Sequence, residues 1–105
     1  MIAIIKKPNT PAETSEVGND YETSKRLVGG YIECVTLDNG VCMVCNEEGK
    51  IYKLPPNLYL RKNKVGMDVV VGSVFFCSDT PDGEFASLTT AQQEYVHKFI
   101  KENSV

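Results

Sequence analysis

Short apolar runs alternate along this chain with clusters of Gly, Pro, Asn and Asp, which is typical of β-strands separated by turns. The pattern predicts strands over residues 2–5, 12–17, 31–38, 41–46 and 51–54, and one long, largely buried strand over 67–78. Within the last run, Gly72 indicates a bulge or a bend. Pro55 and Pro56 cannot donate to a sheet ladder, so residues 55–57 are excluded from a central strand. Residues 58–60 fit either a helical turn or an extended bridge.

The dipeptide Asn39-Gly40 lies between two of these runs and predicts a two-residue hairpin turn. In such a hairpin the numbers of facing residues sum to 79, which places Cys34 opposite Cys45. Two small side chains packed side by side are the simpler interpretation of this pair. A cross-strand disulfide is the alternative, and it is a strained one.

Two further segments favour helices. Residues 21–28 follow Asp20, a good N-cap residue, and end at Gly29. Near the end of the chain, Thr89 and Gln92 have the spacing of a capping box. The helix that follows carries one apolar stripe, formed by Ala91, Tyr95, Val96, Phe99 and Ile100. Together the elements predict an α+β fold: an antiparallel sheet of about five strands, with the C-terminal helix and the short N-terminal helix packed on one face.

Length and charge narrow the class of protein. The chain has 105 residues, which fits a single domain over residues 1–105. Lys plus Arg number 11 and Asp plus Glu 14, and a net charge of −3 excludes a generally basic nucleic-acid binder. No apolar run reaches the roughly 18–20 residues of a membrane span. A signal peptide has a basic segment ahead of its apolar stretch, and residues 1–7 have none. We therefore expect these residues to belong to the fold, and the protein to be cytoplasmic.

Candidate catalytic and metal-binding groups are sparse. Cys42 and Cys45 form a C-x-x-C pair, but on a strand these two side chains point to opposite faces. We therefore expect Cys34, Cys42, Cys45 and Cys77 to be buried structural thiols. The single histidine, His97, falls off the helical stripe and is expected on the surface. These patterns predict no enzyme, no metal site and no cofactor.

Basic and aromatic residues suggest a binding site instead. Two basic segments are candidates for contacts to phosphate, and three tyrosines for stacking against a base. Asn57, held by the prolines before it, either presents its amide to a ligand or caps the turn that follows. The candidate ligand-binding residues are Lys6, Lys7, Tyr31, Tyr52, Asn57, Tyr59, Arg61, Lys62 and Lys64. A small nucleotide fits such a patch better than a long nucleic acid, which the net negative charge repels. The alternative is a solvated basic loop, with tyrosines at the margin of the core.

Several segments together resemble one protein family. They are Leu27–Glu33 (LVGGYIE), Val44–Lys50 (VCNEEGK), Leu54–Asn57 (LPPN), Gly72–Phe76 (GSVFF) and Ser87–Thr89 (SLT). In their order and spacing they resemble the domain-of-unknown-function 3846 family, small proteins of bacteria, phages and mobile elements. Residues 61–64 (RKNK) are basic, whereas the family pattern has an acidic segment at this place. The resemblance implies a setting inside the bacterial host cytoplasm, in phage–host conflict, and implies no catalytic residues.

Two hypotheses for function follow. The first is a non-enzymatic counter-defence protein of a phage or mobile element, which sequesters a nucleotide-type immune signal. The second is a protein–protein interaction module that docks on a host or phage protein through a sheet edge or the terminal helix. A closed, polar, positively charged pocket favours the first, and a flat apolar patch favours the second. In either case the short edge strands of a small sheet predict a homodimer.

Overall fold

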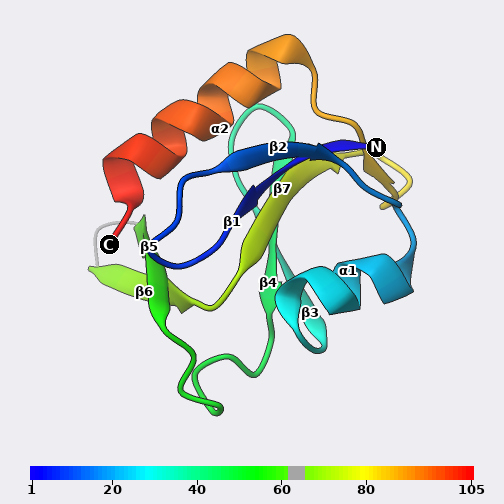
Figure 1. Cartoon of the computed structure of the whole chain (residues 1–105). Helices are drawn as coiled ribbons and strands as arrows, with labels where there is room; N and C mark the ends of the chain where they lie inside the picture. Colours follow the sequence, from blue (N-terminus) through cyan, green and yellow to red (C-terminus); the bar gives the residue numbers. More distant parts are fainter. Residues whose placement is uncertain (62–65) are drawn as a thin grey trace.

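The computed structural model describes residues 1–61 and 66–105 of the chain. Its centre is an antiparallel sheet with the strand order β2-β1-β7-β4-β3, and β8 extends the sheet beside β7 (Figure 1). The strands are β1 (Ile2–Lys6), β2 (Glu13–Glu16), β3 (Ile32–Thr36), β4 (Val41–Asn46), β7 (Val74–Asp79) and β8 (Phe85–Ala86). The antiparallel α+β class is therefore confirmed, with more strands than the sequence predicts.

A second, smaller sheet pairs β5 (Pro56–Arg61) with β6 (Met67–Val71). The strand predicted over residues 51–54 is wrong, because these residues close a turn. The N–H of Tyr52 donates to the carbonyl of Glu48 at 3.1 Å, and the N–H of Leu54 donates to the carbonyl of Gly49 at 3.0 Å. Pro56 is the first residue of β5, a position at which strands tolerate a residue without an N–H.

A corner at Gly72 divides the run that the sequence predicts as one long strand. Gly72 has φ of +79°, and a Cβ at this position would lie 2.7 Å from Cδ1 of Leu54. Both observations exclude a side chain here. The corner moves the chain from β6 in the small sheet to β7 in the main sheet.

The two helices cover opposite faces of the main sheet, so the prediction that both pack on one face is wrong (Figure 1). Val28 of α1 (Tyr21–Val28) packs with Cys42 and Val44. Val96 of α2 (Thr90–Asn103) packs with Val41 and Met43 on the other face. Every residue of β4 is buried as a result. Its unbroken apolar run, without the alternation of a half-exposed strand, is the sequence signal for this double cover.

The predicted caps are confirmed at both helices. Asp20 accepts from the N–H of Thr23 at 3.0 Å, and Thr89 and Gln92 form a complete capping box. Along the predicted stripe of α2, Val96 and Ile100 are buried while Ala91 is exposed. No helix in the described part of the chain is long and apolar enough to cross a membrane.

The hairpin between β3 and β4 contains the predicted turn but not the predicted register. Asn39 and Gly40 both have positive φ, and the N–H of Val41 donates to the carbonyl of Asp38 at 3.2 Å. The carbonyl of Val41 accepts from the N–H of Leu37, at 2.9 Å, and not from the N–H of Asp38. Leu37 and Asp38 therefore both lie opposite Val41. This β-bulge frees the N–H of Asp38 to donate to the Tyr95 hydroxyl of α2 at 3.2 Å.

The bulge corrects the predicted pairing of the cysteines. Facing residues sum to 78, so Cys34 lies opposite Val44 and Cys45 lies opposite Glu33. All four thiols are free. Cys42, Cys45 and Cys77 are buried as predicted, whereas Cys34 is exposed because β3 is at the margin of the sheet.

Candidate functional site

Two of the predicted ligand-binding residues are buried against each other. The Lys6 ammonium donates to Oδ1 of Asn57 at 3.1 Å and to the carbonyl of Lys7 at 2.8 Å. The Asn57 amide donates to the carbonyls of Lys6 and Gly72, at 2.9 and 2.8 Å. Burial lowers the pKa of Lys6. This pair ties the end of β1 to β5 and to the Gly72 corner, and neither the predicted open amide nor the predicted turn cap describes Asn57.

The structure does not gather the remaining predicted residues into one pocket. Tyr31 stands over the Lys25 ammonium of α1, with the nitrogen 5.1 Å from the ring centre. Tyr52 is 64% exposed in the turn after β4, and Lys7 is exposed at the end of β1. Tyr59 and Arg61 belong to β5, whereas Lys62 and Lys64 lie outside the described residues.

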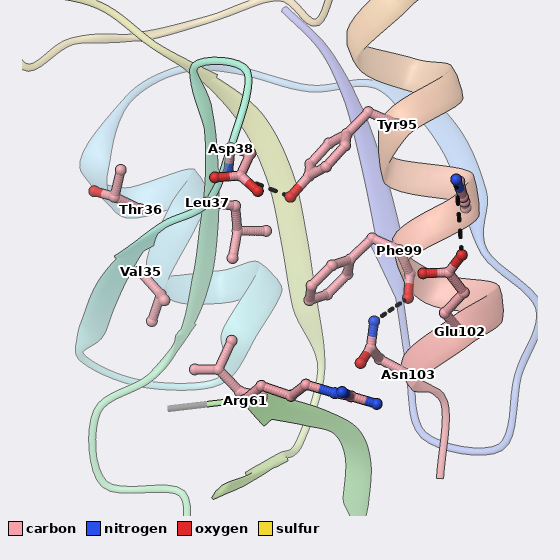
Figure 2. A pocket seen from close by; sticks show the side chains of 11 residues that line it. Val35, Thr36, Leu37, Asp38, Arg61, Tyr95, Phe99, Glu102 and Asn103 are labelled. Carbon is pink, nitrogen blue, oxygen red and sulfur yellow. Dashed lines mark hydrogen bonds and ion pairs between the residues drawn. The ribbon is translucent and has the colours of Figure 1, made fainter. Parts of the chain in front are cut away.

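A hollow of about 860 Å³ lies between the β3–β4 hairpin and α2. Figure 2 shows Leu37 of the hairpin and Phe99 of the helix facing each other across it, with Arg61 at its lower end. Polar groups at the margin are engaged locally: the Asn103 amide donates to the carbonyl of Phe99 at 2.8 Å. The floor is apolar, and Lys98 and Glu102 are part of the polar margin.

A second hollow of about 290 Å³ continues along the same strand, between the main sheet and the small sheet. Val35 and Leu60 line both hollows. We call the two together the β3 groove, which has Glu33 and Val35 of β3 and Leu37 directly after it on one side, and Leu60 and Phe99 across from them. Alternate residues of a strand share one face, and Leu37 continues this alternation, so the three side chains line the groove in sequence.

The outer margin of β3 is an unpaired sheet edge beside this groove. Leu37 directs its N–H toward β4, where it donates to Val41. Because backbone groups alternate along an antiparallel strand, the odd-numbered residues of β3 face β4 and the even-numbered ones face outward. Among the described residues, no backbone hydrogen bond reaches the outward groups of Ile32, Cys34 and Thr36. Free backbone groups and side-chain hollows therefore lie along one strand.

The cysteine thiols near this edge are weak nucleophiles. Desolvation, with Cys42 nearby, raises the pKa of Cys34 to about 11. Desolvation raises the pKa of Cys45 to about 12, and a hydrogen bond with Cys77 raises that of Cys42. Protonated thiols do not attack electrophiles or bind metal readily. Among the described residues, no three His, Cys, Asp or Glu side chains are arranged to hold a metal ion.

Sequence reasoning missed the groove residues because it assigned them to other roles. Phe99 belongs to the helical stripe, which indicates core, and Val35 belongs to an ordinary strand pattern. Leu60 lies in a segment whose structure the sequence left open. Only the sheet order places β3 at an edge, and no local signal in residues 32–36 reports that order.

The comparisons with known proteins give one match. The profile of a family described as a domain of unknown function (DUF3846) matches residues 1–101. The chain matches no curated protein and no solved structure.

Proposed function

The chain belongs to the DUF3846 family, a family defined without a function, and from this premise we propose that it is a protein-binding module. It binds an extended segment of a partner protein as an additional strand on the outer edge of β3. The segment's backbone pairs with the outward groups of Ile32, Cys34 and Thr36. Its side chains on one face enter the β3 groove. This mode of recognition takes affinity from backbone hydrogen bonds and specificity from side-chain pockets.

One observation carries the proposal: the unpaired edge and the groove run along the same strand. An unpaired edge alone is common in small sheets, and proteins usually protect it. Here the hollows open beside β3 and are floored by Val35, Leu60 and Phe99. A strand that pairs with β3 therefore covers exposed apolar area and satisfies backbone groups at the same time. At the other end of the strand order, β2 exposes the polar side chains Glu13, Thr14 and Glu16.

The nucleotide-sequestering role expected from the sequence stays a prediction. Of its candidate residues that the structure describes, Arg61 lines the β3 groove, while Lys6 and Asn57 bond to each other. Tyr31 and Tyr52 belong to different parts of the surface. Counter-defence is equally a prediction, and a docking module is compatible with it.

Peptide selection followed by hydrogen exchange tests the proposal. Random peptides of about ten residues, long enough to span a strand, are displayed on phage and selected on the immobilised protein. A selected peptide is then added to isotope-labelled protein, and amide exchange is followed residue by residue. We expect new protection at Ile32, Cys34 and Thr36, while Glu33 and Val35, which already pair with β4, change little. Peptides that bind without protecting these three amides would contradict strand addition.

Two proline variants provide a matched comparison. Cys34→Pro replaces an outward N–H of β3 with a ring that blocks an incoming strand, and Thr14→Pro makes the same change at the outward edge of β2. We expect peptide binding to weaken by about tenfold or more in Cys34→Pro, and to stay within about twofold in Thr14→Pro. Circular dichroism establishes that both variants fold. Should Cys34→Pro fail to fold, N-methylation of the peptide's β3-facing amides makes the same test on the unmodified protein.

A further inference from the structure

The charges at the two ends of the β3 groove differ, and from them we infer the chemistry of its occupant. We propose that the bound strand carries a Lys or Arg facing Glu33, followed at alternate positions by two apolar side chains facing Val35 and Leu37. This inference rests on the proposed strand-binding function and specifies its partner. The occupant is thus a basic–x–apolar–x–apolar segment of another protein, read in either chain direction.

Two carboxylates that have no basic partner among the described residues define one end of the groove. Glu33 of β3 and Glu47, just after β4, are exposed and line the smaller hollow. The other charged groups of that hollow, Lys50 and Asp68, form an ion pair with each other. Among the described residues, no Lys or Arg nitrogen lies within 4.0 Å of a Glu33 or Glu47 carboxylate. A cation brought by the partner is the group that balances this end.

The apolar wall beside the carboxylates selects a long side chain. Ile51 lines the same hollow and is 74% exposed, in a turn that projects from the molecule between β4 and β5 (Figure 1). Lys and Arg place an aliphatic stem on apolar surface and keep the charged end in a polar site. The stem covers Ile51 while the charge reaches Glu33 and Glu47. A short polar side chain makes neither contact.

The rest of the groove has an apolar floor within a polar margin of balanced charge. Val35 and Leu60 form the middle, where the two hollows join, and Leu37 faces Phe99 at the far end. The charged residues that line the hollow at this end are Asp38 and Glu102, which are acidic, and Arg61 and Lys98, which are basic. Lys98 and Glu102 lie 3.9 Å apart as an ion pair, and the two signs balance, so this end carries little net charge. Side chains on one face of a strand recur every second residue, in the occupant as in β3. This spacing gives the alternation in the proposed segment.

A second copy of this chain does not fit the same site. The side chains that its own edge presents to the groove are Glu33, Val35 and Leu37, none of which is the cation that Glu33 and Glu47 need. Pairing about Cys34 also places that carboxylate over the apolar middle of the groove, which is unfavourable. Each copy further carries a net charge of −3, and the two copies repel each other.

Composition of the selected peptides tests this inference separately from the proposed function. Random decapeptides displayed on phage are selected in parallel on the wild-type protein and on Cys34→Pro, and peptides specific to the wild type are sequenced. We expect a Lys or Arg two residues from a large apolar residue to be enriched. Enrichment of β3-dependent peptides without a basic residue would overturn the inference and leave the strand-binding function standing. Absence of any β3-dependent peptide would overturn both.

Charge-matched variants complete the test. Glu33→Gln with Glu47→Gln removes the carboxylates of the groove, and Glu13→Gln with Glu94→Gln removes two exposed carboxylates elsewhere. For a selected lysine peptide we expect the first pair to weaken binding roughly three- to tenfold and the control pair to leave it unchanged, the range for two partly exposed ion pairs. Replacing the peptide's lysine by glutamine should lower the wild-type affinity similarly and abolish the difference between the variants. Equal effects of the two double variants would indicate net charge alone and would contradict a specific site.

Discussion

Asn57 is a single buried residue that joins three parts of the chain. It is the extra residue where the β5 register shifts, between Pro56 and Leu58, and its side chain is almost inaccessible to solvent. Its side chain accepts a hydrogen bond from the Lys6 ammonium and donates to the carbonyls of Lys6 and Gly72. The Lys6 and Asn57 side chains are both buried. A bulge residue with an amide side chain is thus a structural link between the two sheets.

Replacing this residue should therefore destabilise the fold. We expect Asn57→Ala to lower the free energy of unfolding by about 2–4 kcal/mol, because buried groups that lose their partners keep their desolvation cost. Urea denaturation followed by circular dichroism measures the change. Asn19→Ala, at an exposed asparagine, is the control and should stay within about 0.5 kcal/mol. A loss below about 1 kcal/mol for Asn57→Ala would mean that water reaches this site.

Cys34 combines an exposed side chain with a raised pKa. A shift from 9.0 to about 11 leaves about 100-fold less thiolate at pH 8 than an unperturbed cysteine has. We therefore expect iodoacetamide to modify Cys34 about 100-fold more slowly in the folded protein than in urea, with the rate rising steadily up to pH 11. Mass spectrometry of digested protein measures this rate. A rate at pH 8 that equals the rate in urea would contradict the raised pKa.

At the scale of elements, α2 both completes the core and forms one wall of the groove. Val96 and Ile100 are buried, whereas Phe99 is partly accessible and packs edge-on against Phe76 with ring centres 6.0 Å apart. A fully buried phenylalanine costs roughly 3–5 kcal/mol when replaced by alanine. Because one side of Phe99 faces the hollow, its replacement removes less buried contact, and we expect a smaller loss of stability.

We accordingly expect Phe99→Ala to destabilise the protein by about 2 kcal/mol and also to weaken peptide binding, since the side chain lines the groove. Thermal unfolding gives the first value and peptide titration the second. His97→Ala, on the exposed side of the same helix, should change neither. A full loss of 4–5 kcal/mol, expected only of complete burial, would indicate that Phe99 belongs to a closed core instead.

At the scale of the whole molecule, β2 and β3, the two ends of the strand order of the main sheet, bear on how the chain can associate. The homodimer expected from the sequence stays a prediction, and β2 is the edge left for it, because the β3 groove does not suit a second copy. The proposed partner requires a free β3, so we expect any dimer to persist in Cys34→Pro. Sedimentation equilibrium of the wild type and of both proline variants, over a tenfold range of concentration, measures this. A dimer lost only in Cys34→Pro would make a second copy the occupant of β3 and would contradict the proposed partner.

Local elements could be read from the residues because local interactions decide them. Asp20, Thr89 and Gln92 cap their helices with side-chain hydrogen bonds to nearby backbone groups. Asn39-Gly40 forms its turn because both residues tolerate positive φ. The antiparallel α+β class followed from the same local pattern.

Tertiary contacts decided the remainder. The register of β3 depends on a bulge whose free N–H is bonded by Tyr95, a residue 57 positions away. Placing β3 at the edge, putting the helices on opposite faces and burying Lys6 with Asn57 all require the sheet order. The β3 groove exists only where strands and a helix distant in sequence meet. A short run such as residues 32–36 has the same composition whether its outer edge is paired or free, and only the folded chain determines which.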